Sequence, residues 1–204
     1  MKLRLHPILA PFFLVLMVTG GLAFYALVFI SLLFHEAGHI FAAKMSGMKV
    51  RSCTIMPYGG ELRIPDRHAY GKRKRIYVAI GGPAATAILL FLSMLFDLPG
   101  DGLFIRIQLV ILGLNLLPIL PLDGGQAISA MLETEEKKFK VRSAFLIYSI
   151  SVLVAVSLLL LPGLPETALF LALALFLLIQ NISTFKFRKY EQAYERLKRK
   201  QLTP

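Results

Sequence analysis

Long runs of apolar residues alternate along this chain with short polar segments. The apolar runs cover residues 7–19, 22–45, 76–96, 103–122, 144–161 and 168–182. About twenty apolar residues in a helix cross a bilayer, so the first run is short for a crossing and is expected to form a hairpin with the second at Gly20–Gly21. The pattern predicts an all-α polytopic membrane protein with six transmembrane helices.

The composition is that of a membrane protein, and the cysteine count limits the kinds of disulfide and metal site that the chain can form. The 204 residues are 56% hydrophobic and 17% charged, with a mean hydropathy of +0.67, which is far more apolar than a globular domain. The single cysteine, Cys53, excludes an intrachain disulfide framework and a zinc site built from several cysteines.

Lysine and arginine residues are distributed unevenly among the polar segments. Of the 23, only Arg106 lies near the turns that six spans would place opposite the termini. The others lie before residue 7, within 44–75 and 137–142, or in the tail from Lys186. By the positive-inside rule, both termini are expected on the cytoplasmic side of the cell membrane. The net charge of +11 is then explained by topology and contact with anionic lipid, and no nucleic-acid partner is expected.

Two histidines and a glutamate interrupt the second apolar run. His35 and His39 are four residues apart, so a helix projects both imidazoles from one face, close enough to bind a single metal ion. Glu36 then lies beside the metal, where a carboxylate can take a proton from a metal-bound water, the general-base role in zinc hydrolases. The alternative, structural histidines on an amphipathic helix, is weaker here because ionisable groups in lipid have no solvent to satisfy them.

A tetrahedral zinc site with two histidines needs a third protein ligand, and the natural candidate is Asp123. It is the sole carboxylate deep in the fourth apolar run and is expected to reach the same membrane depth as the histidines. Pro118 and Pro121 cannot continue an ordinary helix, and Gly124–Gly125 permits unusual backbone conformations, so the fourth span is predicted to unwind there. In the alternative interpretation, Asp123 caps a following helix at an ordinary loop.

The polar segment after the second run has the pattern of a short, membrane-associated β-hairpin. Its strands, within residues 49–56 and 60–64, are separated by Pro57, Tyr58 and Gly59. A free strand edge beside the metal would bind a peptide by strand addition and hold it extended for hydrolysis. The alternative is an ordinary cytoplasmic loop that lies on the lipid headgroups.

Three stretches together resemble one family of enzymes. They are His35-Glu36-Ala37-Gly38-His39, the segment from Asn115 to Gly125, and Gly82-Pro83 in the third apolar run. In combination they are similar to the motifs of the site-2 proteases, which are intramembrane zinc metalloproteases. The resemblance covers roughly residues 5 to 185.

The resemblance implies a zinc-dependent intramembrane endopeptidase that cleaves a membrane-associated regulatory protein near the cytoplasmic face. One zinc ion per chain would be bound by His35, His39 and Asp123, and Glu36 would activate the water. His6-Pro7, the turn at residues 56–60 and the small size most resemble the sporulation branch, whose member matures a sigma-factor precursor. That branch also implies inhibitory membrane proteins as partners.

Two features depart from the pattern of the family. Many members have Asn in the third span where this chain has Thr86. Relatives in the sporulation branch commonly continue into a CBS domain, whereas this chain is expected to comprise a six-span core, residues 1–185, and a basic cytoplasmic tail helix, residues 186–204, with no CBS or PDZ domain.

The candidates for substrate binding or oxyanion stabilisation are Asn115, Thr86, Tyr58, Gly59 and Gly60.

Two other functions are compatible with the same residues. A divalent metal transporter could use two histidines and an aspartate at a broken helix, but it would not need Glu36 as a base, and the chain shows no internal repeat. A non-catalytic membrane scaffold could bind clients in the same groove, but it has no use for the Glu36 carboxylate. Glu36 therefore discriminates the protease from both alternatives.

Overall fold

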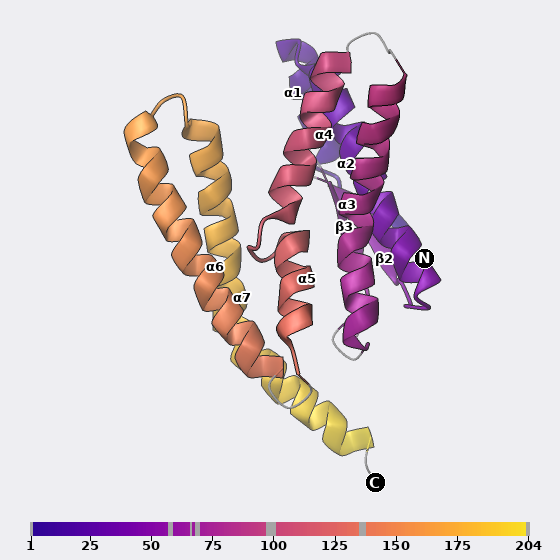
Figure 1. Ribbon diagram of the computed structural model, residues 1–204, viewed down its shortest axis with the longest axis vertical. Helices are drawn as coiled ribbons and strands as arrows, with labels where there is room; N and C mark the ends of the chain where they lie inside the picture. The colour runs from indigo at the N-terminus through magenta and orange to yellow at the C-terminus, as the bar shows by residue number, and fades with distance from the viewer. Residues whose placement is uncertain are drawn as a thin grey trace. The chain divides into compact units, whose positions relative to one another are not determined.

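The computed structural model describes residues 2–56, 59–65, 67, 70–96, 101–134 and 138–202 (Figure 1). The chain divides into two compact units, Met1–Leu117 and Pro118–Pro204. The first unit holds the histidine pair and the small sheet, and the second holds Asp123.

The first unit is built on four helices, α1 (Leu9–Thr19), α2 (Leu22–Met45), α3 (Lys72–Leu95) and α4 (Asp101–Leu116). Helix α3 packs against both α2 and α4 (Figure 1). The α2–α3 contact is close because glycines face each other across it. A Cβ added to Gly81 would lie 2.7 Å from the carbonyl oxygen of Gly38 and 2.7 Å from Cβ of Ala42. Small residues allow helix backbones to approach in this way in membrane proteins.

A three-stranded sheet lies beside these helices. Its strands are β1 (Lys2–Leu5), β2 (Ser52–Met56) and β3 (Gly59–Arg63), in the order β1-β2-β3. Strands β2 and β3 pair antiparallel, with Met56 opposite Gly59, which confirms the predicted hairpin. Strand β1 pairs parallel with β2 and was not predicted, because a four-residue strand is too short to show a pattern. Two residues between the hairpin strands, Pro57 and Tyr58, lie outside the described residues.

The second unit contains α5 (Asp123–Leu132), α6 (Lys138–Leu160), a short 3-10 turn, η2 (Leu161–Gly163), and α7 (Ala168–Leu202). Helices α6 and α7 form an antiparallel pair, and α5 packs against α6. The apolar core of this unit consists of Ile119, Leu153, Ala174 and Leu177. Helix α7 extends to Leu202 and so includes residues 186–202 of the predicted basic tail helix.

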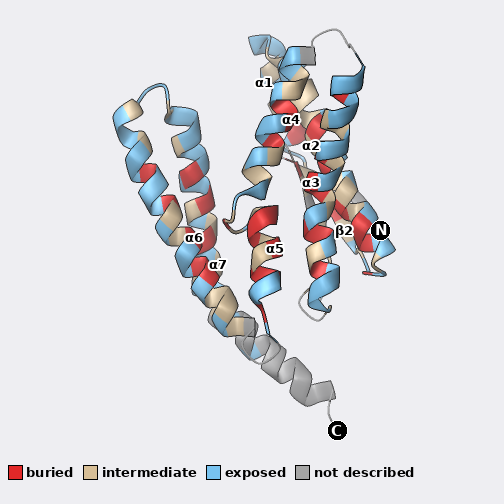
Figure 2. Ribbon diagram, viewed as in Figure 1, coloured by how far each residue is buried: buried red, intermediate tan, exposed pale blue. Residues whose placement is uncertain are grey.

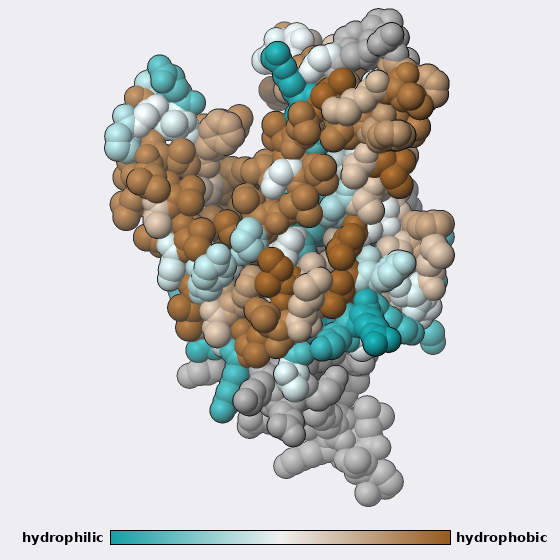
Figure 3. Space-filling view, in the orientation of Figure 1, coloured by the Kyte–Doolittle hydropathy of each residue, from teal (hydrophilic) through white to brown (hydrophobic). Residues whose placement is uncertain are grey.

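Four described helices are long and apolar enough to cross a membrane, namely Leu22–Met45, Lys72–Leu95, Phe139–Gly163 and Ala168–Arg188. Buried residues occupy only part of each helix surface (Figure 2), and apolar side chains cover much of the exposed remainder (Figure 3). Val18 and Leu159, for example, are 81% and 79% exposed. This surface is that of a multi-pass membrane protein, whose lipid-facing side chains are apolar.

The first and fourth predicted spans correspond to shorter apolar helices, Leu9–Thr19 and Gly102–Leu116. Helix α4 ends at Leu116, the next six residues are not helical, and α5 begins at Asp123. Pro118 and Pro121 lie in this interruption, and a proline lacks the N–H that a continuing helix would use.

Candidate metal centre

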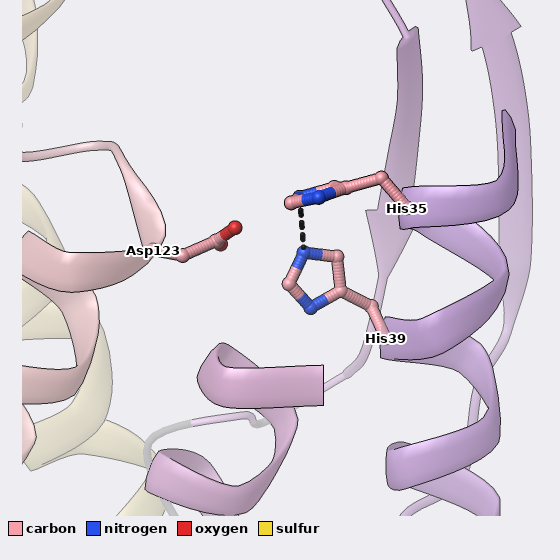
Figure 4. Close-up of side chains that lie close together, drawn as sticks. All are labelled: His35, His39 and Asp123. Carbon is pink, nitrogen blue, oxygen red and sulfur yellow. Dashed lines mark hydrogen bonds between the residues drawn. The ribbon is translucent and has the colours of Figure 1, made fainter. Parts of the chain in front are cut away.

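The first half of the candidate site is a pair of imidazoles on helix α2. His35 and His39 lie one turn apart, and their rings meet edge to face, with centroids 4.9 Å apart (Figure 4). Both side chains are buried, with exposed fractions of 3% and 8%. Two buried polar rings on one helical face require partners, and the neighbouring helix α3 provides them.

Each imidazole is held at its Nδ1 atom. Nδ1 of His39 lies 2.7 Å from the backbone carbonyl oxygen of Val78. The amide nitrogen of Gly82 lies 3.2 Å from the same Nδ1. The carbonyl contact decides the tautomer because it is shorter and a carbonyl can only accept, so His39 carries its proton on Nδ1. Nε2 of His39 is then left with a lone pair, which is the form that binds a metal.

His35 is held by a hydroxyl. Its Nδ1 lies 2.9 Å from Oγ1 of Thr86, and the threonine is fully buried. A hydroxyl can donate or accept, so Thr86 suits both tautomers of His35. When His35 carries its proton on Nε2, it donates to Nε2 of His39. When Thr86 accepts the proton of Nδ1, both Nε2 atoms are available as ligands.

The spacing of the two Nε2 atoms tests whether a zinc ion fits. These atoms lie 3.2 Å apart, which is the contact drawn as a dashed line in Figure 4. Zn–N bonds of about 2.0–2.1 Å at a tetrahedral angle separate two ligand nitrogens by about 3.3 Å. The pair is thus spaced as two ligands of one tetrahedral ion are, with both Nδ1 atoms held by second partners, as is usual for metal-bound histidines.

Gly82 of α3 leaves the space beside the two nitrogens open. A Cβ added there would lie 2.5 Å from Nε2 of His35 and would also overlap Nε2 of His39. A side chain at position 82 would therefore fill the place of a metal. The sequence placed Gly82 in a family motif but did not predict its position beside the two Nε2 atoms. The signal available was a glycine inside a helix, directly before the internal proline Pro83.

Glu36, the predicted general base, lies against the first two residues of strand β3. A Cβ on Gly60 would lie 3.0 Å from Cγ of Glu36, and one on Gly59 would lie 3.7 Å from its Oε1. Gly59 also has a φ of +127°, which side-chain-bearing residues rarely adopt. The structure therefore brings both predicted glycines to the predicted base, and their missing side chains leave room for the carboxylate.

The single cysteine lies behind this contact. Cys53 is buried, and a Cβ on Gly60 would lie 3.4 Å from its Sγ. Burial raises the pKa of the Cys53 thiol, and the negative charge of Glu36 raises that pKa further. A thiol that stays protonated is a poor nucleophile and a poor metal ligand, so Cys53 acts as an apolar packing residue.

Of the remaining predicted residues, the structure describes Asn115 and Asp123. Asn115 lies in the last turn of α4, where its Nδ2 donates to the carbonyl oxygen of Ile111 at 2.9 Å. Asp123, also labelled in Figure 4, is the first residue of α5 in the second unit and is 8% exposed. The positive end of a helix dipole stabilises a carboxylate in this position. Tyr58 lies outside the described residues.

Comparison with known proteins gives matches of three kinds. Residues 23–100 match peptidase family M50. A zinc metalloprotease of Methanocaldococcus jannaschii is 32% identical over 120 residues, which are 53% of this chain and 34% of that protein. A Synechocystis protein named as a zinc metalloprotease is 34% identical over 54% of this chain and 31% of its own length. Stage IV sporulation protein FB of Bacillus subtilis is 28% identical over 63% of this chain and 46% of that protein.

The chain thus spans between about a third and a half of the length of the curated relatives it matches. Among solved structures, the site-2 protease from Methanocaldococcus jannaschii is similar with a TM-score of 0.54 and 20% sequence identity. That match covers 93% of this chain and 89% of the other. At this identity the likeness establishes a common fold.

Proposed function

We propose that this chain, a relative of the site-2 proteases of peptidase family M50, is a zinc-dependent intramembrane endopeptidase. The observation that carries the proposal is the pair of Nε2 atoms 3.2 Å apart on α2, with Glu36 of the same helix beside strand β3. A metal-binding pair, an adjacent carboxylate and a strand edge are the parts that hydrolysis of an extended peptide requires.

The zinc ligands in this proposal are His35, His39 and Asp123. As a set they offer two imidazoles and one carboxylate, and each of the three side chains is buried. Catalytic zinc sites commonly have three protein ligands of these types and leave one position for water. When bound, zinc supplies Lewis acidity, which lowers the pKa of water toward about 7 and polarises a peptide carbonyl.

The protein residues then divide the remaining work. Glu36 accepts a proton from the attacking water and returns it to the leaving amine of the cleaved bond. Thr86 and the carbonyl of Val78 orient the two imidazoles through their Nδ1 atoms. Asn115 remains a candidate to stabilise the oxyanion, and for that role its amide would exchange the Ile111 carbonyl for substrate.

The substrate in this proposal is a membrane-associated protein bound as an extended strand. In the described sheet, β3 is an edge strand, and its first two residues lie against Glu36. A helical substrate would have to unwind, because its carbonyls are otherwise engaged within the helix. Strand addition to β3 supplies replacement hydrogen bonds to the unwound segment. For the family's sporulation branch the substrate would be a sigma-factor precursor, a narrower assignment supported by the 28% identical sporulation protein.

The membrane arrangement we propose keeps six spans, with α1 and α4 as the short ones and the fourth span unwound between Leu116 and Asp123. The basic segments then lie on the cytoplasmic face of the cell membrane, in contact with anionic lipid, together with both termini. Residues 1–185 would form the core and residues 186–204 a cytoplasmic tail, with inhibitory membrane proteins as potential partners.

The decisive experiment compares Glu36→Gln with wild type. Both proteins are purified in detergent, their zinc content is measured, and each is incubated with a panel of single-span substrates tagged on the cytoplasmic side. We expect one zinc per chain in both and cleavage by wild type alone. Glu166→Gln, which changes an exposed carboxylate in the turn before α7, is the matched control and should cleave normally. Absence of zinc from the wild type, or equal cleavage by Glu36→Gln, contradicts the proposal.

A further inference from the structure

The segment that leads into Asp123 interrupts the helical chain. Residues 117–122 are not helical, although they follow a run of apolar residues. Backbone N–H and C=O groups that leave a helix in apolar surroundings need new partners, since no bulk water is there to bind them. The partners of Leu120 come from two different helices of the second unit.

Both polar backbone groups of Leu120 are bound by buried side chains. Its N–H donates to Oγ of Ser149 on α6 at 3.1 Å. Its carbonyl oxygen accepts a short hydrogen bond from Nδ2 of Asn181 on α7. Ser149 is fully buried and Asn181 is 1% exposed. We call these two contacts the Leu120 clamp.

The other hydrogen bonds of Ser149 and Asn181 determine whether each side chain donates to Leu120 or accepts from it. The hydroxyl of Ser149 donates its proton to the carbonyl of Phe145 at 2.9 Å. A lone pair of the same oxygen therefore accepts the hydrogen bond from the N–H of Leu120. The side-chain amide of Asn181 donates one N–H to the carbonyl oxygen of Leu177 at 2.8 Å and the other to the carbonyl oxygen of Leu120. Its Oδ1 has no hydrogen-bond partner among the described residues. Burial of an amide side chain among apolar residues costs free energy unless the amide is hydrogen-bonded. The hydrogen bond to Leu120 offsets part of that cost for Asn181.

The clamped residue is tied to the first turn of α5. The N–H of Leu122 donates to the carbonyl of Ile119 at 2.9 Å, and the N–H of Gln126 donates to the carbonyl of Leu122 at 2.9 Å. A Cβ on Gly125 would lie 2.7 Å from the nitrogen of Leu120 and would overlap the carbonyl of Ile119. The loop therefore rests directly on the helix that begins with Asp123. A displacement of Leu120 would be transmitted to that carboxylate.

We propose that Ser149 and Asn181 are positioning residues for Asp123, which they hold in place as a metal ligand by clamping the backbone of Leu120. The inference rests on the proposed function, because it takes Asp123 as the third zinc ligand. In this proposal both side chains act through the backbone of Leu120, and neither is itself a ligand. Their effect is on the free energy needed to bring the Asp123 carboxylate into the coordination sphere, so it is measured as metal affinity and ligand geometry.

The test uses the full chain in detergent, stripped of metal with a chelator and titrated with Co²⁺ alone. Visible absorption of Co²⁺ reports the geometry of its ligands, and competition with a chelator gives the affinity. The variants are Ser149→Ala, Asn181→Leu, Ser149→Thr and Asp123→Ala. Ser157→Ala is the matched control, because this buried serine on the same helix donates within α6, to Leu153.

We expect Ser149→Ala and Asn181→Leu to weaken Co²⁺ binding about tenfold to a hundredfold, the usual effect of removing a residue that supports a ligand, and to alter the spectrum. Ser149→Thr retains the hydroxyl and should bind as wild type does, as should Ser157→Ala. Ser149→Ala is the deciding variant, because alanine favours the helix and leaves α6 folded. Wild-type affinity and spectrum in Ser149→Ala overturn the clamp. If instead Asp123→Ala binds as wild type does, the ligand assignment itself is wrong and the clamp falls with it.

Discussion

Oγ1 of Thr86 lies 2.9 Å from Nδ1 of His35, which joins helix α3 to the metal-binding face of α2. The contact is fully buried on the threonine side, so water does not compete for it. A hydroxyl at this place can donate to His35 when the metal site is empty and accept from it when the site is filled. Thr86 therefore supports the imidazole in both states.

The isosteric change Thr86→Val removes the hydroxyl and keeps the volume. We expect zinc affinity to fall about tenfold to a hundredfold, because the ring of His35 loses the partner that orients Nε2. Competition with a chelating dye measures the affinity. Thr86→Ser retains the hydroxyl and should stay close to wild type. Equal affinity in Thr86→Val and wild type would show that Thr86 only fills space.

Gly82→Ala should prevent metal binding while leaving α3 folded. The added methyl would overlap the Nε2 atoms of both histidines, whereas alanine itself is a better helix former than glycine. We expect the purified variant to contain little or no zinc and to keep its helical circular dichroism. Gly113→Ala on α4 is the control, since nothing lies within 4 Å of a Cβ there. A Gly82→Ala protein with a full zinc complement would contradict the assigned position of the metal.

Much of the histidine pair was predictable from sequence because helical geometry alone determines it. A separation of four residues brings His35 and His39 to one face, and the structure has them there. Their Nδ1 partners were not predictable, because Val78 and Thr86 come from another helix, 39 and 51 residues further along the chain. The sequence suggested Thr86 for substrate or oxyanion binding, which stays a prediction, whereas the structure places its hydroxyl at Nδ1 of His35.

The fold shows the same division between local and long-range information. Apolar runs predicted the long helices, since length and hydropathy are local properties. The antiparallel hairpin was also predictable from local sequence, because Pro57 separates two strand-like segments, which pair as β2 and β3. The parallel partner β1 was not, because Lys2–Leu5 pairs with a strand about fifty residues away. The hydrogen bonds from Ser149 and Asn181 to Leu120 likewise depend on tertiary packing alone.

The pKa of Cys53 provides an electrostatic test of the contact with Glu36. Burial is the larger cause of the raised pKa of Cys53, and the negative charge of Glu36 raises that pKa further. Neutralising the Glu36 carboxylate should therefore lower the pKa of Cys53. In metal-free protein, we expect Glu36→Gln to form the thiolate at a lower pH than wild type does. Ultraviolet thiolate absorbance, taken as the difference from Cys53→Ser, measures the titration, and Cys53 is the single cysteine. An unchanged or higher midpoint in Glu36→Gln would show that Glu36 does not act on the thiol.

Gly60→Ala tests whether strand β3 sets the position of the general base. The new Cβ would lie 3.0 Å from Cγ and 3.3 Å from the carboxyl carbon of Glu36, so the carboxylate must shift by a few tenths of an ångström. Small displacements of a catalytic group are costly, and we expect kcat to fall about tenfold. Zinc content should stay at the wild-type level, because neither histidine is touched. Gly71→Ala, where a Cβ meets nothing within 4 Å, controls for the general effect of an added methyl. A Gly60→Ala protein that lost its zinc would indicate that the hairpin supports the fold of the metal site, whereas loss of kcat alone would assign the hairpin to the alignment of Glu36 with the bound peptide.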